Sequence, residues 1–184
     1  LMNYQEVYDI QEKYFNELID KKLNHEKDFN NHLIFCEHPH VYTLGKSGSE
    51  NNLLIDYIQL QAKQATFIKT NRGGDITYHG PGQIVGYPIF DLEKFDMQAR
   101  LYIYTMEEAI INTMKYFNIN AARLEGATGV WIDGTTKNAR KICAIGVRIS
   151  RGVTMHGFAL NVNTDLSYFN FINPCGYTDK KATS

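Results

Sequence analysis

The sequence has few cysteines and no excess of charge of either sign. Its 184 residues include three cysteines, Cys36, Cys143 and Cys175, and no C-x-x-C pair, so neither a disulfide framework nor a zinc ribbon is indicated. Free thiols are typical of a reducing compartment, and we therefore expect a cytoplasmic protein. The formal net charge of −1 provides no broad basic field, which argues against nucleic acid as a partner.

Long hydrophobic runs are also missing. No apolar run approaches the ~20 residues of a membrane span, so no membrane association is expected. The N-terminal segment is amphipathic and acidic, unlike a signal or transit peptide. The chain starts Leu1-Met2 and stops at KKATS without a clear final element, and we expect both ends to be trimmed. Its length fits one domain, residues 1–184, with a sizeable core.

Hydrophobic periodicity predicts the main elements. Apolar residues recur at three-to-four spacing between Tyr4 and Ile19 and again between Ile103 and Phe117, which predicts two helices; Asp96 is expected to cap the second. Asp133-Gly134 and Arg151-Gly152 are expected to form turns between antiparallel strands. The strands are expected at 33–37, 41–45, 66–70, 141–150 and 155–163. This pattern indicates an α+β fold, a mixed, largely antiparallel sheet with flanking helices.

Residues 72–88, RGGDITYHGPGQIVGYP, form a glycine-rich run. The run holds five of the fourteen glycines and two of the four prolines, yet its pattern is that of a strand. Glycine in a strand costs backbone entropy and supplies no side chain to pack, so the backbone here is expected to approach a ligand closely. The run matches neither phosphate-binding motif and contains no lysine. It predicts a binding wall.

The three cysteines differ in their surroundings. Cys175 stands between Pro174 and Gly176, which predicts a thiol presented on a constrained loop. From local sequence, a nucleophile and an inert loop thiol are equally open for it. Cys143, in ICAIGV, and Cys36 are expected to be packed core residues.

A nucleophilic thiol needs a base or a cation beside it. His79 in the glycine-rich run is one candidate. Lys141 is another, because a lysine that opens an apolar strand is unusual and desolvation lowers the pKa of an amine. The alternative for Lys141 is a strand-end lysine that reaches out to water. Strand alternation puts Lys141 on the same face as Cys143, so spacing alone leaves open which thiol it serves.

The segment Cys36-x-His38-x-His40 aligns three possible metal ligands. Pro39 and the lack of a clear fourth ligand favour a structural turn instead, and no metal is expected. His79 and His156 are expected to line a pocket or to cap hydrogen bonds.

Five blocks of the sequence together resemble one family. RGGDITYHGPGQIVGYPIFDL resembles the signature of the lipoyl(octanoyl) transferases, also called lipoate–protein ligase B. Four other blocks occur in the family's order and at its spacing: HPHVYTLG before this signature, and RKICAIGVRIS, MHGFALNVN and the PCG near the end after it. The resemblance covers about residues 32 to 180 and implies the fold of the lipoate and biotin protein ligases. The family's C-terminal helix is missing after KKATS.

The resemblance implies an acyltransferase with no cofactor, acting in the first step of endogenous protein lipoylation. It implies octanoyl-acyl carrier protein as donor, and as acceptors the lipoyl domains of 2-oxoacid dehydrogenase complexes and the glycine cleavage H protein. It places the acyl-thioester cysteine at Cys175 and the lysine that lowers its pKa at Lys141. We expect the protein to be a monomer. The implied substrate-binding residues are Arg72, Gly73, Gly74, Asp75, Ile76, Thr77, Tyr78, His79, Ala144, Ile145, Gly146, Gly157, Phe158 and Ala159.

Three other interpretations compete. An ATP-dependent lipoate or biotin ligase would share the fold but need no cysteine. A cysteine hydrolase would use Cys175 with His79 and release free octanoate. A module that binds lipoyl domains or acyl carriers without catalysis is the third, and Lys141 with Cys175 argues against it.

Overall fold

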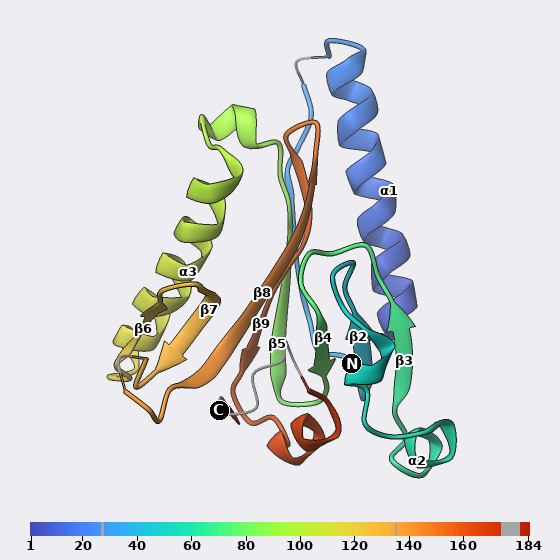
Figure 1. Ribbon diagram of the computed structural model, residues 1–184. Coiled ribbons are helices and arrows are strands. Elements are labelled where there is room, and N and C mark those ends of the chain that lie inside the picture. The colour runs from blue at the N-terminus through green and yellow to red at the C-terminus, as the bar shows by residue number, and fades with distance from the viewer. Residues whose placement is uncertain (27, 135, 174–180) are drawn as a thin grey trace.

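The computed structural model describes residues 1–26, 28–134, 136–173 and 181–184. A large twisted sheet lies between two long helices, and a small sheet stands beside it (Figure 1). The order in the large sheet is β1-β5-β9-β8-β7-β6, with β10 added to β8. Pairing is antiparallel along this path and parallel between β10 and β8. The strands are β1 (His32–Cys36), β5 (Gln83–Ile89), β6 (Ala121–Leu124), β7 (Ala127–Ile132), β8 (Arg140–Ser150), β9 (Val153–Asn161) and β10 (Lys181–Ala182). The expected α+β arrangement is confirmed.

The small sheet joins the large one through the glycine-rich run. Its order is β3-β2-β4, where β2 is antiparallel to β4 and parallel to β3. Because the run 72–88 contains all of β4 and all of β5 except its last residue, it passes directly from the small sheet into the large one. The remaining elements are β2 (Val41–Leu44), β3 (Thr66–Lys69), β4 (Ile76–His79), α2 (Tyr57–Ala62) and the 3₁₀ helices η1 (Glu50–Asn52), η2 (Leu92–Phe95) and η3 (Leu166–Phe171).

Helix α1 (Tyr4–Leu23) covers one face of the large sheet. The Asn3 side chain caps its first turn by accepting from the Gln5 N–H. Its buried stripe repeats every three to four residues, and Phe15 and Leu18 pack against β5 and β9 residues such as Ile89 and Met155. The stripe consists of Tyr4, Val7, Gln11, Phe15 and Leu18. The predicted N-terminal helix is confirmed, and Gln11 adds an unexpected polar residue to its buried side.

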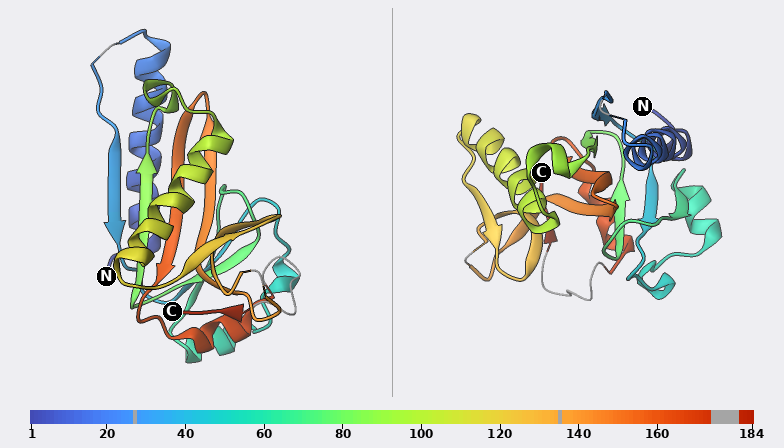
Figure 2. Two further views of the ribbon diagram at one scale, coloured as in Figure 1. Left: turned by 90° about the vertical axis from the view of Figure 1, so that its left-hand side faces the viewer. Right: turned by 90° about the horizontal axis from the view of Figure 1, so that it is seen from above.

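Helix α3 (Ala99–Tyr116) covers the opposite face, as the turned views show (Figure 2). Its residues Ile110 and Met114 pack on Cys143 in the core. The predicted helix is confirmed, but the expected cap at Asp96 is wrong. Asp96 ends η2 in a left-handed conformation with φ 50°, and the helix starts after Gln98. The short 3₁₀ turn inserted before α3 moves Asp96 away from the helix start.

The two predicted turns join antiparallel strands, as expected. Arg151 and Gly152 have φ of 52° and 76°, the positive values that a tight hairpin turn needs. β7, which ends just before Asp133, and β8, which starts only at Arg140, also pair antiparallel. The expectation of no final element is wrong, because β10 pairs with β8; two residues are too few to give a periodic signal. Among the described residues, no helix is long and apolar enough to cross a membrane.

Candidate active site

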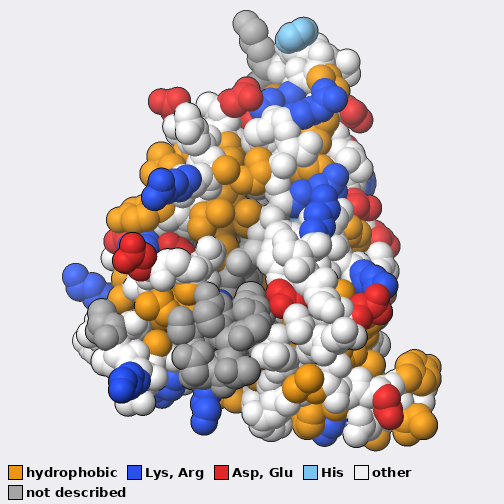
Figure 3. Space-filling model, viewed as in Figure 1, with side chains coloured by type: hydrophobic (Ala, Val, Ile, Leu, Met, Phe, Trp, Pro, Cys, Tyr) orange, Lys and Arg blue, Asp and Glu red, His pale blue; other side chains and the backbone are white. Residues whose placement is uncertain are grey.

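A cavity of about 770 Å³ lies between the large sheet, the small sheet and η3. This volume is in the range of about 300–1,000 Å³ that is usual for small-molecule sites. The space-filling view shows hydrophobic side chains gathered along the middle of the molecule between the α3 side and the α1 side (Figure 3). The cavity is lined by residues of the glycine-rich run, by β8 and by β9. The pocket therefore has the size and the apolar character that an acyl chain needs.

Almost all of the predicted substrate-binding residues lie in the wall of this cavity. All of Arg72 to His79 except Tyr78 line it, and so do residues 144–146 and 157–159. Tyr78 points the other way, because its neighbours Thr77 and His79 take the cavity side of β4. The Tyr78 ring is fully buried in the core of the small sheet, and its hydroxyl is 2.7 Å from His40 Nδ1. The wall expected from the glycine-rich run is present.

A β-bulge decides where Lys141 points. Val130 pairs with Cys143, but the next residue of β7, Trp131, pairs with Lys141, so β8 has one extra residue here. Lys141 therefore faces the cavity, where its Nζ lies 4.7 Å from the centre of the Trp131 ring. Cys143 faces the opposite side. The expectation that the two share a face is wrong, because simple alternation does not hold across a bulge.

Gly129 allows the bulge to form. It has φ 121°, a conformation that other residues rarely adopt. A Cβ on this glycine would lie 2.5 Å from the Cys143 carbonyl oxygen and 3.4 Å from Lys141 Cε. The Lys141 side chain therefore lies across a bare stretch of β7 backbone, which leads it into the cavity.

Cys143 and Cys36 differ from each other. Cys143 is fully buried in the core beneath α3, and this burial raises the pKa of its thiol to about 12. Its expected core position is confirmed. Cys36 is only partly buried, and it packs at the edge of the core against the cluster that contains Val7, Val85 and Tyr87. Its Sγ lies 3.5 Å from His38 Nε2, and burial raises the pKa of the Cys36 thiol to about 11.

Glycines on both walls bring the glycine-rich run directly against β8. The Gly73 N–H donates to the Val147 carbonyl over 2.9 Å, and a Cβ on Gly146 would lie 3.0 Å from the Gly73 carbonyl oxygen. This is closer than side chains normally permit. The bare backbone that the sequence indicates therefore serves strand-to-loop packing as well as room for a ligand.

Buried polar groups form a connected network along the cavity. Arg72 Nη2 donates to the carbonyl and hydroxyl oxygens of Thr43 at 2.6 and 3.0 Å. His79 contacts Thr43 Oγ1 at 3.3 Å and Gln83 Oε1 at 2.8 Å. Gln83 Nε2 donates to Asn161 Oδ1 over 2.9 Å. Because each member has partners, the network fixes the wall rather than leaving it adaptable.

His79 is a wall residue within this network. Burial, helped by the neighbouring His38, lowers the pKa of His79 to about 3, so the ring is neutral. Both ring nitrogens have hydrogen-bond partners, Gln83 and Thr43. The prediction that His79 and His156 line a pocket is confirmed.

His38 and His40, on either side of Pro39, make structural hydrogen bonds and ring contacts. His38 Nδ1 donates to the Met2 carbonyl over 2.9 Å, and its Nε2 is 2.7 Å from the Tyr87 hydroxyl. Burial lowers the pKa of His38. His40 contacts Tyr78 and stacks on Tyr168. In the ranges that the structure describes, no three His, Cys, Asp or Glu residues gather in a way that could hold a metal ion.

Several cavity residues were missed from the sequence. Tyr4 comes from α1, Trp131 from β7 and Asn161 from β9, and each belongs to an element whose sequence pattern indicates only core packing. The Asn161 side chain also donates to the Thr183 carbonyl over 2.9 Å, which ties the cavity wall to β10.

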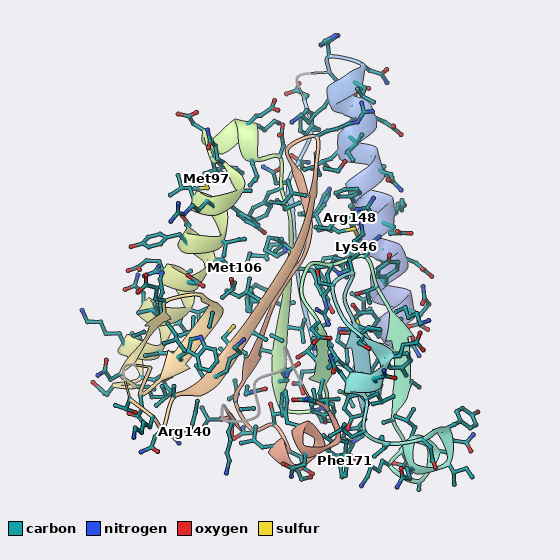
Figure 4. The ribbon with its side chains drawn as sticks, in the orientation of Figure 1. Lys46, Met97, Met106, Arg140, Arg148 and Phe171 are labelled. Atoms are coloured by element: carbon teal, nitrogen blue, oxygen red, sulfur yellow. The ribbon has the colours of Figure 1, made fainter. Side chains whose placement is uncertain are left out.

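The predicted nucleophile lies outside the described residues. Cys175 belongs to the segment 174–180, and the described residues on either side of that segment, Asn173 and Lys181, both line the cavity. Lys181 pairs with Arg140, and Ala182 pairs with Lys141 itself. Arg140 and Arg148 mark the two parts of β8, the first at its lower end and the second beside α1 (Figure 4).

Comparison with known proteins gives a consistent result. The family model described as lipoyl protein ligase A/B catalytic domain matches residues 3–184. An octanoyltransferase of Bacteroides thetaiotaomicron is 55% identical over 184 residues, which cover 100% of this chain and 81% of that protein. An octanoyltransferase of Cytophaga hutchinsonii is 56% identical over 192 residues, with 100% and 79% covered.

Solved structures show the same fold at low identity. A bipartite lipoate protein ligase from Thermoplasma acidophilum matches with a TM-score of 0.67 and 20% identity, covering 88% of this chain and 60% of that one. A lipoate-protein ligase A bound with ATP matches with a TM-score of 0.62 and 18% identity, covering 78% and 59%. From the family model and the closely similar relatives, the chain belongs to the octanoyltransferases, acyltransferases that share the lipoyl protein ligase A/B catalytic domain.

Proposed function

We propose that this chain transfers octanoyl from acyl carrier protein to a lysine of lipoyl domains through an acyl thioester on Cys175. The observation that carries the proposal is the position of Lys141, which the β-bulge turns into the wall of an apolar cavity of about 770 Å³. Asn173 and Lys181, the described residues on either side of the segment 174–180, line the same cavity. The similarity to octanoyltransferases supports the choice of octanoyl as the acyl group.

Lys141 is suited to proton transfer with a thiol. Its side chain is partly buried, lies across Gly129 and ends beside the Trp131 ring. An amine in such a site is less well solvated than in water, which favours its neutral form. The face of an indole attracts a cation in turn. We therefore propose Lys141 as the acid and base catalyst of the reaction.

The proposed reaction has two steps that share one proton carrier. Lys141 takes the proton of the Cys175 thiol, and the thiolate attacks the octanoyl thioester of the carrier protein. The carrier thiolate leaves and is protonated, which gives octanoyl-Cys175. The acceptor lysine then attacks this thioester after losing a proton, for which neutral Lys141 is the proposed base. The Cys175 thiolate leaves and is reprotonated. Exchange of one thioester for another is near neutral in free energy, so the transfer needs no ATP.

The partners and setting belong to the same proposal. The acceptors would be the lipoyl domains of 2-oxoacid dehydrogenase complexes and the glycine cleavage H protein. The enzyme would act as a monomer in the cytoplasm, in the first step of endogenous lipoylation, without a cofactor.

The test is to locate the acyl group. Incubation with octanoyl-acyl carrier protein should add an octanoyl mass to Cys175, and Cys175→Ser should carry it as an ester or not at all. Cys143 is the internal control, because the core beneath α3 encloses its thiol. An adduct on Cys143 would contradict the assignment. Transfer that depends on ATP would indicate a ligase, and release of octanoate without an acceptor would indicate a hydrolase.

A further inference from the structure

Glu107 places a carboxylate in the buried face of helix α3. This helix lies against β6 and β7 (Figure 1), and the side that it buries carries apolar residues such as Met106, Ile110 and Met114. Only 7% of Glu107 is exposed. Acidic residues are almost never buried to this degree unless they are paired, so the groups that bind the carboxylate indicate its role.

The Glu107 carboxylate joins the helix to two neighbouring strands. Its Oε1 accepts from the Gly129 N–H of β7 over 2.9 Å, and its Oε2 accepts from Arg123 Nε of β6 over 3.0 Å. Arg123 is held by α3 in turn, because its Nη2 donates to the Tyr104 carbonyl and to Glu108 Oε2 at 2.8 and 2.7 Å. Hydrogen bonds to an ionised group are shorter and stronger than those between neutral groups. The carboxylate therefore fixes the backbone of β7 against the helix.

The two partners of Glu107 lie where the pairing of the strands is irregular. The register of β6 with β7 shifts at Arg123, and the register of β7 with β8 shifts within two residues of Gly129. A bulge disrupts the ladder locally, and Glu107 supplies the acceptor for the Gly129 N–H at this point. Glu107 therefore secures the bulge from the α3 side of the sheet.

The same glycine supports Lys141 on the cavity side. A Cβ on Gly129 would lie 3.4 and 3.5 Å from Lys141 Cε and Cδ, so the lysine chain passes over the place that a side chain would fill. Lys141 Nζ then lies 4.7 Å from the centre of the Trp131 ring. A movement of the Gly129 peptide would move the surface on which this chain lies. A misplacement of about 1 Å at a reacting group can lower a rate about 10²-fold.

We propose that Glu107 is a positioning residue for Lys141. Through its bond to the Gly129 N–H, it holds the bulge in the shape that directs the Lys141 amine into the cavity, and Arg123 holds the carboxylate in place. The placement of the side chain follows from these contacts alone. Its effect on the reaction rests on the proposed function, in which Lys141 carries the proton.

The test separates the reach of residue 107 from its charge. Glu107→Asp keeps the charge but shortens the side chain by one methylene, so it should no longer reach the Gly129 N–H. Glu107→Gln keeps the length and one acceptor oxygen for Gly129, while Arg123 retains the Tyr104 carbonyl and Glu108. Glu108→Asp is the matched control, because it shortens the more exposed acidic partner of Arg123 and leaves the Glu107 side chain intact.

The first measurement reports the position of Lys141 without catalysis. In protein labelled with ¹³C in its lysines, the ring current of Trp131 should shift the ε-methylene signal of Lys141 upfield of the signals of exposed lysines. Lys141→Arg identifies this signal by its loss. Glu107→Asp should remove most of the shift, whereas Glu107→Gln and Glu108→Asp should keep it.

The second measurement is the rate of octanoyl transfer. Glu107→Asp should lower kcat about tenfold or more and leave the affinity for octanoic acid within about twofold, because the cavity lining is unchanged. Glu107→Gln and Glu108→Asp should keep kcat within about threefold of the parent. Rescue by the longer, uncharged side chain is what a general loss of stability would not produce.

The two measurements together decide between the outcomes. Equal effects of Glu107→Asp and Glu107→Gln, or an equal loss in Glu108→Asp, would overturn the positioning role. Loss of the shift in Glu107→Asp at an unchanged kcat would support the positioning and contradict Lys141 as the proton carrier. A parent protein that transfers no octanoyl would contradict the proposed function, while the lysine signal would still test where Glu107 places Lys141.

Discussion

Strand β8 places Lys141 and Cys143, which are two positions apart in the sequence, on opposite faces of the sheet. Cys143 faces α3 and is enclosed by Ile110, Met114 and Val130 in a packed core. Lys141 faces the cavity beside Trp131. A regular strand would put both residues on one side. The single extra residue at the bulge separates them, so one strand supplies a thiol to the core and an amine to the cavity.

The two faces of β8 differ in how densely they are packed and in whether they carry buried polar groups. On the core face, large apolar side chains fill the volume, and burial raises the pKa of the one thiol there to about 12. On the cavity face, Ala144 and Gly146 leave volume open, and buried polar groups such as Arg72 and His79 are held in a bonded network. The same sheet thus packs the core on one side and lines the cavity on the other. The following experiments test this division.

The largest effect is expected at Lys141. Lys141→Ala should lower octanoyl transfer by about 10²- to 10⁴-fold, the usual contribution of a positioned acid or base, and leave the free energy of unfolding nearly unchanged. The measurement is kcat/KM with octanoyl-acyl carrier protein and a lipoyl domain. Arg140→Ala is the matched control, because Arg140 is exposed and pairs with Asp133 at the surface. Such pairs contribute little, so this variant should stay within about twofold of the parent; equal losses in both would remove the special role of Lys141.

The sequence predicts the helices and most strands because their periods are long and regular. Residues 4–19 and 103–117 each repeat over several turns, and each forms one long helix. The strand β10 has two residues and gives no period. The bulge at Lys141 cannot be predicted from the sequence of β8, because the glycine that accommodates it, Gly129, belongs to β7. It takes the pairing of β7 with β8 to interpret that glycine.

For the site, the sequence predicts the cavity residues that lie together in one segment and misses those that come from separate elements. The run from Arg72 to His79 can be recognised in the sequence from its own glycines. Tyr4, Trp131 and Asn161 reach the same cavity from three other elements, and in sequence each is an ordinary residue of a helix or strand. Tyr78 is the reverse case, since it belongs to the run but its strand turns it into the core. A resemblance can assign a block of residues, but the backbone decides which of them face the cavity.

The next largest effect tests how the bulge is built. Gly129→Ala should lower the free energy of unfolding by roughly 3 kcal/mol or more, because it adds a disfavoured φ and a Cβ 2.5 Å from the Cys143 carbonyl oxygen. Gly126→Ala is the control, since Gly126 also has positive φ, 74°, but nothing within 4 Å of the added Cβ. It should cost about 1 kcal/mol. Urea unfolding measures both, and equal costs would mean that the contact with Cys143 does not constrain the bulge.

An intermediate effect is expected from pH, through the cavity face. Burial lowers the pKa of both His79 and His156 to about 3, whereas in the unfolded chain it is about 6.5. Below pH 6.5 the unfolded state therefore binds more protons, and stability falls as the pH drops toward 3. The loss is at most about 1.4 kcal/mol per pH unit for each histidine. Unfolding free energies at pH 7, 6 and 5 should show this slope, and His156→Gly should reduce it; a flat profile would mean that water reaches these rings.

The smallest effect is expected on the core face, at Cys143. Cys143→Ala removes a buried sulfur from a packed cluster and should cost about 1 kcal/mol of unfolding free energy, as the loss of one heavy atom from a core does. The rate of octanoyl transfer by the folded variant should not change, because the bulge turns this side of β8 away from the cavity. In the native parent, the Cys143 thiol should resist alkylation at pH 8, while the partly buried Cys36 reacts faster. If Cys143→Ala slowed transfer as much as Lys141→Ala, the two faces of β8 would have to be energetically coupled, and the bulge would not separate structure from chemistry.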